Sequence, residues 1–278
     1  MNKINNTLKV MIYSKNWTHQ VAIEYTYRSI KQTRIIIQGT RDTDILVSYA
    51  INTQPNLLII DDAPRNAVAL TLALRQQCPD TAIIFMQDEF LFSDKIVVKY
   101  FDGIALKKYD ALMNDPPCLL LAEYHCLLRT LREEVNLTKL PSWRTQGVSE
   151  ALQSIKQLMH VHFSHLIASP RAQEVVLGWL VKGVEPITAG RLLGCSSKVV
   201  YHYRLMAMKV LGIQNRTRDF IASLTVTAGP VSYYPMREHR PALVSSPPPL
   251  PSHEQVKIKT SSDEKQGLAN IQEYGVTV

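Results

Sequence analysis

Residues 197–211 carry the side chains whose types and spacing best fit a binding chemistry. In a helix of about 100° per residue, Val200, Tyr203, Ala207 and Leu211 share one apolar face. The opposite face carries two lysines, a histidine, a tyrosine and a leucine: Lys198, Lys209, His202, Tyr201 and Leu205. Lysines pair with phosphates, and a histidine ring can donate to or accept from a base edge. This face therefore suits the major groove of double-stranded DNA.

The segment around this helix has the layout of a helix-turn-helix, in which the second helix enters the groove. Ser196 or Ser197 can cap that helix, whose N-terminal dipole favours a nearby phosphate. We expect the lysines at both ends to contact the DNA backbone. Tyr201 and His202 are expected to reach base edges, and Leu205 to touch a thymine methyl group. Arg204 flanks the apolar face. Two roles fit this position: its guanidinium group contacts a phosphate, or its aliphatic stem packs against the domain.

Positive charge is concentrated in the same part of the chain. The 278 residues carry a net charge of +7, and residues 169–227 hold eight Lys/Arg against three Asp/Glu. Residues 228–278 hold five charges of each sign, so the helix-turn-helix segment supplies most of the excess. A local basic excess is what phosphate binding requires, although a solvated charged surface would have the same composition.

Segment 169–227 resembles the LuxR-type (GerE-type) DNA-binding domain. The residues that carry the resemblance are Ser169, Pro170, Arg171, Glu174, Val175, Gly183, Leu193, Ser196, Lys198, Val200, Leu211, Gly212, Asn215, Arg216 and Thr217. The resemblance implies that a last helix, from about 217 to 224, pairs two copies on a two-fold site, as a homodimer or with a related subunit. Alternatively, Phe220 and Ile221 only close the core of the monomer.

Three features depart from the LuxR-type pattern. One extra residue lies between Pro170 and Gly183, with Gly178 inside the first helix, which predicts a bulge or a shifted helix. Ala189-Gly190 replaces the usual Ile-Ala and thins a core contact. Leu205 occupies a reading position where polar residues are commoner, which places part of the sequence readout in doubt.

The first 134 residues alternate apolar runs with amphipathic stretches. The runs, which predict strands, are 8–13, 34–38, 56–60, 81–86 and 103–106. Helices are expected near 18–31, 41–52, 65–77, 90–99 and 117–134. Strands that are apolar throughout indicate a parallel sheet buried on both faces, so we predict an α/β doubly wound, five-stranded domain.

This domain resembles the receiver domain of bacterial response regulators. Asp61 closes the third strand at the place of the phospho-acceptor, and Lys107 fits the lysine after the fifth strand. The departures outnumber the matches. Tyr13-Ser14-Lys15 stands where two acids would hold Mg²⁺, Gln87-Asp88 replaces the Thr or Ser of the family, and Pro64 is shifted by one position. Since phosphoryl transfer depends on charge stabilisation, Asp61 is open to two interpretations, a phosphorylation site or a hydrogen-bonded acid in a turn.

The remaining segments predict connections. Residues 135–163 are expected to form a linker and a helix, with Ala151, Ile155, Leu158, Met159 and then Leu166 facing one way. His160, His162 and His165 have no Cys or carboxylate partner nearby, so we predict no metal site. Residues 228–278 are Pro/Ser-rich and predict a disordered tail. Within it, SPPPLP favours polyproline II.

Composition excludes several classes of protein. Four cysteines without metal-ligand spacing indicate a reducing compartment. The chain has no leader pattern at its start and no run of about eighteen uncharged apolar residues, so we expect a cytoplasmic protein outside the membrane. Among catalytic motifs, no phosphate loop, nucleophile elbow or HExxH helix is present, so no enzyme and no cofactor are predicted.

Together these patterns predict a sequence-specific transcriptional regulator that acts without phosphorylation. Its expected parts are a receiver-like domain (1–134), a connection (135–163), a helix-turn-helix domain (164–227) and a tail (228–278). Two alternatives stay open: a regulator phosphorylated on Asp61, and an interaction subunit that binds DNA only with a related partner.

Overall fold

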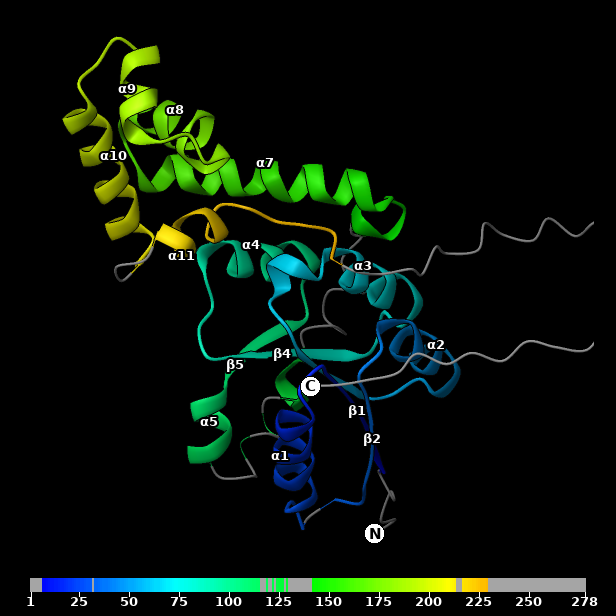
Figure 1. Cartoon of the computed structure of the whole chain (residues 1–278). Coiled ribbons are helices and arrows are strands. Elements are labelled where there is room, and N and C mark those ends of the chain that lie inside the picture. The colour runs from blue at the N-terminus through cyan, green and yellow to red at the C-terminus, as the bar shows by residue number, and fades with distance from the viewer. Residues whose placement is uncertain are drawn as a thin grey trace, which may run out of the picture. The chain divides into compact units, whose positions relative to one another are not determined.

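The computed structural model describes residues 7–31, 33–115, 119, 122, 124–127, 129, 142–213 and 217–229. The chain divides into two compact units, 1–235 and 236–278, and every described residue lies in the first. Strands alternate with helices up to residue 114, and the described residues from 142 to 229 form helices and connecting turns without a strand (Figure 1). The predicted succession of an α/β domain and an all-α domain is confirmed. Residues 230–278 of the predicted tail lie outside the described residues.

All five strands run parallel. They are β1 (Leu8–Ser14), β2 (Ile35–Thr40), β3 (Leu57–Asp61), β4 (Ala82–Gln87) and β5 (Ile104–Lys108). Their order across the sheet is β2-β1-β3-β4-β5, so the connections change direction between β1 and β3. In this topology the carboxyl ends of those two strands flank a crevice. The register places Ser14, the last residue of β1, opposite Asp61, the last residue of β3.

Helices cover both faces of the sheet (Figure 1). One face packs against α1 (Trp17–Arg28), and the other against α2 (Thr43–Thr53), α3 (Val68–Gln77) and α4 (Phe92–Phe101). Along β3, Leu57 and Ile59 join the α1 side, whereas Leu58 and Ile60 join the opposite core. Because both faces are buried, the strands are continuously apolar, which is why their positions could be predicted.

A short helix that was not predicted follows the fifth strand. Helix α5 (Tyr109–Asn114) follows β5 directly, and a helix had been predicted near 117–134. That range lies mostly outside the described residues, and those described within it (119, 122, 124–127 and 129) are helical. Helix α5 places Tyr109 at the carboxyl end of β5.

A short 3-10 turn, η2 (Ser142–Arg144), leads into the long helix α7 (Val148–Leu166). Ala151, Ile155 and Met159 are buried in the core that contains α3 and α4. The prediction for Leu166 was wrong: it is 45% exposed, because the buried stripe continues instead through Phe163 to Ile167. Among the described helices, none is long and apolar enough to cross a membrane.

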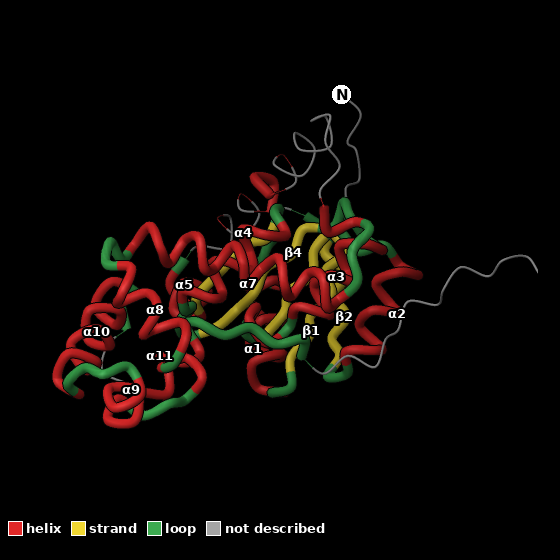
Figure 2. Tube along the Cα trace, turned by 90° about the horizontal axis from the view of Figure 1, so that it is seen from above, coloured by secondary structure: helices red, strands yellow, loops and turns green. Residues whose placement is uncertain are grey.

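The helix-turn-helix part consists of α8 (Pro170–Gly178), η3 (Leu180–Lys182), α9 (Pro186–Leu192), α10 (Ser197–Val210) and α11 (Thr217–Ala222). These helices gather around one core (Figure 2). Val175, Val200, Ala207 and Phe220 are at most 2% exposed in it. The extra residue before Gly183 is accommodated by ending α8 at Gly178 and adding the 3-10 turn, in agreement with the predicted irregularity.

Two glycines shape the turn between α9 and α10. Gly194 has a φ of +62°, a conformation that side chains with a Cβ rarely adopt. At Gly190, a Cβ would lie 2.9 Å from the carbonyl oxygen of Cys195. Gly190 therefore allows the turn at Cys195 to approach α9 closely. From the sequence, the Ala189-Gly190 pair had been expected only to reduce packing in the core.

The segment after α11 returns to the α/β domain. Val226 is buried among residues of α3 and α4, and the Thr227 N–H donates to the carbonyl of Arg65 (2.8 Å). The Ala69 N–H, in the uncapped first turn of α3, donates to the carbonyl of Ala228 (2.9 Å). Residue 228 was predicted to begin the tail, and this boundary was wrong because Ala228 supplies the missing helix cap.

Candidate functional site

The outward face of α10 is exposed as predicted. Lys198, Tyr201, His202, Leu205 and Lys209 are all exposed, with Tyr201 at 44% and Leu205 at 63%. On the opposite face, Val200 and Ala207 are fully buried, and Tyr203 and Leu211 pack against the same core. The helix is thus fixed to its domain by one stripe while the other remains accessible to a ligand.

Arg204 is packed against the domain. Its guanidinium carbon lies 5.5 Å from the centre of the Phe220 ring, and the side chain is half-buried. This contact fits a cation–π pair and favours the packed-stem interpretation over a phosphate contact.

The cap of α10 differs from the expectation. Ser196 is the N-cap residue, but its side chain makes no capping hydrogen bond, and its carbonyl instead accepts from Val199 and Val200. The N–H groups at the start of α10 are therefore not occupied by a serine hydroxyl. An open helix N-terminus of this kind favours an anion.

Residues that match the LuxR-type pattern in α8 have structural roles. The Ser169 hydroxyl accepts from the Ala172 N–H (3.3 Å) and caps α8. Arg171 pairs with Glu174 (2.9 Å) and donates to the carbonyl of Leu193 (3.1 Å). Arg171 thereby ties the first helix to the turn that precedes α10.

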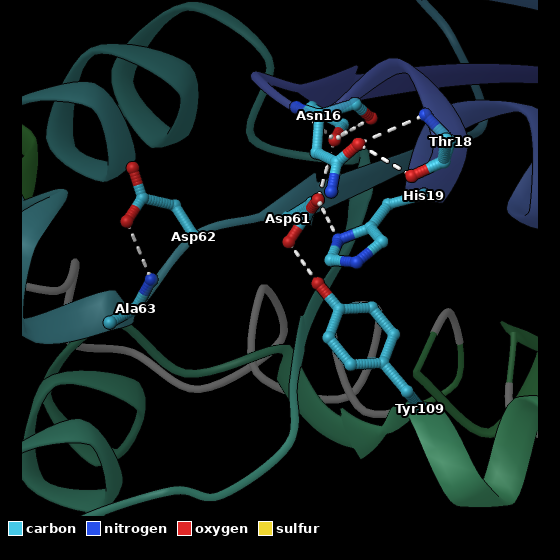
Figure 3. Close-up of polar contacts among 8 residues, drawn as sticks. Asn16, Thr18, His19, Asp61, Asp62, Ala63 and Tyr109 are labelled. Carbon is cyan, nitrogen blue, oxygen red and sulfur yellow. Dashed lines mark hydrogen bonds and ion pairs between the residues drawn. The ribbon is translucent and has the colours of Figure 1, made fainter.

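A second polar cluster surrounds Asp61 at the carboxyl edge of the sheet (Figure 3). Its Oδ2 accepts from Ser14 Oγ (2.5 Å) and lies 3.0 Å from His19 Nδ1, while its Oδ1 accepts from the Tyr109 hydroxyl. The His19 and Tyr109 rings are 4.8 Å apart. The Asp61 side chain is only 8% exposed, so both carboxylate oxygens are engaged within the protein.

Tyr109 is held as a hydrogen-bond donor. Burial raises the pKa of its hydroxyl far above the usual value, and the hydrogen bond to Asp61 raises it further. A neutral phenol therefore occupies one side of the Asp61 carboxylate. A carboxylate surrounded by donors is stabilised in place and is a poorer nucleophile.

The groups beside Asp61 do not fit a magnesium ion. Lys15 Nζ lies 3.3 Å from Asp62 Oδ2, and the nearby carboxylate raises the pKa of this lysine. An ammonium group thus stands where the receiver resemblance implies a divalent cation. Asp62 points away from Asp61 (Figure 3). Among the described residues, no group of three or more His, Cys, Asp or Glu could hold a metal.

Lys107, the other residue matched to receiver domains, lies within β5 and is buried. Its Nζ donates to Asp115 Oδ2 at 2.9 Å. Gln87 is the last residue of β4. The end of this strand therefore carries no small hydroxyl side chain, in contrast to the Thr or Ser that the receiver resemblance implies there. Of the residues expected from the sequence, the structure therefore gathers only Asp61 into this cluster.

The three histidines of α7 do not gather. His160 and His165 are exposed, and His162 Nε2 lies 3.1 Å from Lys99 Nζ of α4. A histidine beside an ammonium group is a poor metal ligand.

Sequence reasoning missed Ser14, His19 and Tyr109 as partners of Asp61. They come from three separate segments that meet only because β1 neighbours β3 and because α5 begins immediately after β5. One signal was present: Ser14 stands at the end of the first strand, where a carboxylate was expected.

Comparison with known proteins supports the fold. No protein-family model and no curated protein matches the chain. Among solved structures, the two-component response regulator RcsB in complex with DNA is similar, with a TM-score of 0.53, 18% identity, and coverage of 79% of this chain and 100% of RcsB. A structure of two RcsB dimers bound to two parallel DNAs gives a TM-score of 0.50 and 19% identity, with the same coverage. The chain has the fold of RcsB.

The RcsB match spans both halves of the described chain. It covers the whole of RcsB, and about a fifth of this chain has no counterpart in it. The succession of the receiver-like sheet and the helix-turn-helix along this chain therefore has a counterpart in a solved structure.

Proposed function

We propose that this protein is a DNA-binding transcriptional regulator of the LuxR type. The observation that carries the proposal is the exposed face of α10, where two lysines, a tyrosine and a histidine project from a helix whose other face is buried. The similar RcsB structures contain DNA, which supports the same ligand class. A cytoplasmic location and a non-enzymatic role follow from this proposal.

The groups on this face divide by chemistry. Lys198 and Lys209 lie near opposite ends of α10 and are suited to the two phosphate backbones that border a groove. Tyr201 and His202 lie between them and offer hydrogen-bonding groups for base edges. Leu205, 63% exposed, offers only an apolar contact, such as that with a thymine methyl group.

We also propose that phosphorylation of Asp61 does not regulate the protein. Three donors occupy the carboxylate, and the Lys15–Asp62 pair replaces a magnesium site. Without a metal, the charge that develops on a transferred phosphoryl group would lack its main stabilisation. Regulation would then depend on abundance, on a partner or on another ligand.

DNA binding by two copies is part of the proposal. The structure of RcsB dimers on DNA supports a dimer, and a two-fold DNA site would match it. Within the monomer, Phe220 of α11 is 2% exposed and Ile221 joins the same core, which supports a core-closing role for this helix. A homodimer and a heterodimer with a related regulator both fit these observations.

A second candidate function is an interaction subunit that binds DNA only with a partner. It is favoured by Leu205 and by two exposed apolar residues of α9, Ile187 (54%) and Leu192 (61%). These groups weaken the polar character of the DNA-facing region. Purified protein without any salt-dependent DNA affinity would favour this candidate.

Binding to a library of randomised DNA sites tests the proposal. Lys198→Ala should weaken binding to all sequences about tenfold and reduce the salt dependence by about one ion, because a phosphate contact is lost. His202→Ala should change which sequences are preferred, at a cost of about 1–3 kcal/mol for the best site. Lys156→Ala, an exposed lysine of α7, is the matched control and should bind as the wild type does. Equal losses for all three variants would contradict the assignment of α10.

A further inference from the structure

Residues 223–229 follow α11 and pass from one hydrophobic core to another; they are here called the clasp. Leu224 is 3% exposed in the core of the helix-turn-helix domain. Val226, only two residues further along the chain, is 6% exposed among residues of α3 and α4. Two residues of extended chain span at most about 7 Å, so the two cores are held next to each other at this point. The clasp therefore attaches the helix-turn-helix domain to the α/β domain.

Two backbone hydrogen bonds fix the clasp on the α/β domain. The Thr227 N–H donates to the carbonyl of Arg65 (2.8 Å), and the Ala69 N–H donates to the carbonyl of Ala228 (2.9 Å). Ala69 lies in the first turn of α3, where no side chain caps the helix. The N–H groups at the start of a helix need acceptors from outside it. The first turn of α3 therefore depends on a carbonyl that is supplied by the segment after α11.

Two neighbouring residues of α4, Ser93 and Asp94, hold the surface that receives the clasp. Both are fully buried. The Ser93 hydroxyl donates to the carbonyl of Ala222 (2.7 Å), the last residue of α11. Asp94 accepts from the Arg65 N–H (3.0 Å) and from its guanidinium group (2.5 Å), and it thereby fixes the residue whose carbonyl accepts from Thr227. Buried polar groups that are paired in this way hold one defined geometry.

The end of the clasp requires a glycine. Gly229 has a φ of +80°, and a Cβ there would collide with the carbonyl oxygen of Asn66 in the 3-10 turn η1 (Pro64–Asn66). Gly183 has nearly the same φ, +81°, but nothing lies within 4 Å of the position that its Cβ would take. Both glycines avoid backbone strain, whereas only Gly229 is also required by a close contact. The clasp thus lies directly against the α/β domain up to its last residue.

The helix-turn-helix domain has another attachment through α7. Ala151, Ile155 and Met159 of this helix are buried with α3 and α4, and Phe163 of the same helix is buried in the helix-turn-helix core. Helix α7 precedes the domain along the chain, and the clasp follows it. A body held at two points rotates less freely than one held at a single point. Opening of the clasp would leave α7 as the remaining one of these two attachments and would uncap α3.

We propose that the clasp has two states, and that its closed state joins the helix-turn-helix domain and the first turn of α3 into one cooperative unit. In the open state both are released together. Local openings of this kind require less free energy than global unfolding, because a short segment makes few contacts. The clasp gives the protein a conformational switch that needs no phosphoryl group on Asp61. The contacts described above do not involve the exposed face of α10, so the inference goes beyond the proposed function and holds without DNA.

Hydrogen exchange of the full chain, measured by mass spectrometry, tests this coupling. Thr227→Pro removes the N–H that donates to Arg65, whereas Thr227→Ala keeps it, changes only an exposed side chain and is the matched control. In Thr227→Pro, amide exchange in the first turn of α3 should be at least about tenfold faster, because the helix cap is lost together with the clasp. Thr227→Ala should exchange as the wild type does. Unchanged exchange in α3 of a folded Thr227→Pro variant would overturn the proposal.

A pair of glycine variants keeps the test decisive if Thr227→Pro does not fold. Gly229→Ala adds backbone strain and a collision with Asn66, whereas Gly183→Ala adds only the strain. Gly229→Ala should therefore accelerate exchange in the first turn of α3, and Gly183→Ala should leave exchange there as in the wild type. Equal exchange of this turn in the two variants would overturn the proposal.

DNA with two half-sites separates this inference from the proposed function. Thr227→Pro should bind a single half-site as the wild type does, because α10 is untouched. Its affinity should depend less on the spacing between two half-sites, with differences at least about fivefold smaller, because the released domain adjusts to each spacing. Identical spacing preferences would show that α3 is uncapped without release of the domain and would overturn the two-state clasp. If neither protein binds DNA, the proposed function fails while the exchange result stands by itself.

Discussion

At the carboxyl edge of the sheet the polar groups face one another, whereas on α10 they face solvent. Ser14, His19 and Tyr109 are all directed at Asp61, which is 8% exposed. Lys198, Tyr201 and His202 are exposed on a helix that is otherwise packed. The first region matches the reactive site of a receiver domain in position, and its polar groups are hydrogen-bonded to one another. The second region presents a surface suited to a ligand.

If the proposed function is right, one fold carries a polar cluster that stabilises the protein and a polar surface that binds a ligand. Buried polar groups contribute mainly to stability when they satisfy one another. Exposed polar groups contribute little to stability and are available for binding. Substitutions in the two regions should therefore separate stability from DNA affinity.

The largest effect is expected for Asp61→Ala. Removing the carboxylate leaves three donors without their acceptor, so the free energy of unfolding should fall by about 2–4 kcal/mol. The DNA affinity of the folded variant should equal that of the wild type. Urea denaturation measures the first quantity and fluorescence anisotropy the second. Asp62→Ala, which loses the partly exposed pair with Lys15 and the hydrogen bond from the Ala63 N–H, is the control and should cost only about 1 kcal/mol. A stable Asp61→Ala variant with altered DNA affinity would reverse the comparison.

Tyr109→Phe is expected to have a smaller effect. It removes one donor and leaves Ser14 and His19 on Asp61, which should cost about 1–2 kcal/mol of unfolding free energy. Tyr25→Phe, an exposed tyrosine of α1, serves as the control.

The pH dependence of the Tyr109 contribution has a definite sign. Its folded-state pKa is raised above the ordinary value of 10.0, so the folded protein keeps a proton that the unfolded chain loses. The stabilisation is therefore fully present below about pH 10 and declines as the pH rises further. The difference in stability between wild type and Tyr109→Phe should shrink above that pH in urea denaturation. A difference that grows instead would show that the hydroxyl is not held as a donor.

The sequence predicted the sheet well because its strands are buried on both faces and hence apolar throughout. The alternation of strands and helices and the two faces of α10 followed from simple periodicity. The Asp61 cluster could not be predicted in the same way. It joins residues 14, 19, 61 and 109, and their proximity depends on the strand order and on the short helix α5, which was not predicted.

Two further errors have a common physical cause. The tail was expected to begin at residue 228, and Leu166 was expected to be buried. Composition and periodicity describe a segment by itself, whereas Ala228 is ordered by the open first turn of α3 and the burial of α7 is decided by Phe163 and Ile167. Such tertiary partners leave little trace in the local sequence.

The smallest effect is expected for Arg204→Ala. The guanidinium group stacks on Phe220, so its loss should lower the unfolding free energy by about 0.5–1 kcal/mol. The set of preferred DNA sequences should stay the same. A change in DNA affinity without a change in stability would place Arg204 with Lys198 as a phosphate contact.

The central claim is that α10 binds DNA without control by a phosphoryl group on Asp61. The direct test is DNA binding by the full chain across a range of salt concentrations, with and without acetyl phosphate and Mg²⁺, combined with intact mass measurement. The prediction is an affinity that falls linearly with salt on logarithmic axes, identical under both conditions, in a protein of unchanged mass. A phosphoryl adduct that disappears in Asp61→Asn and changes the DNA affinity of the wild type would contradict the claim, as would a complete lack of salt-dependent binding.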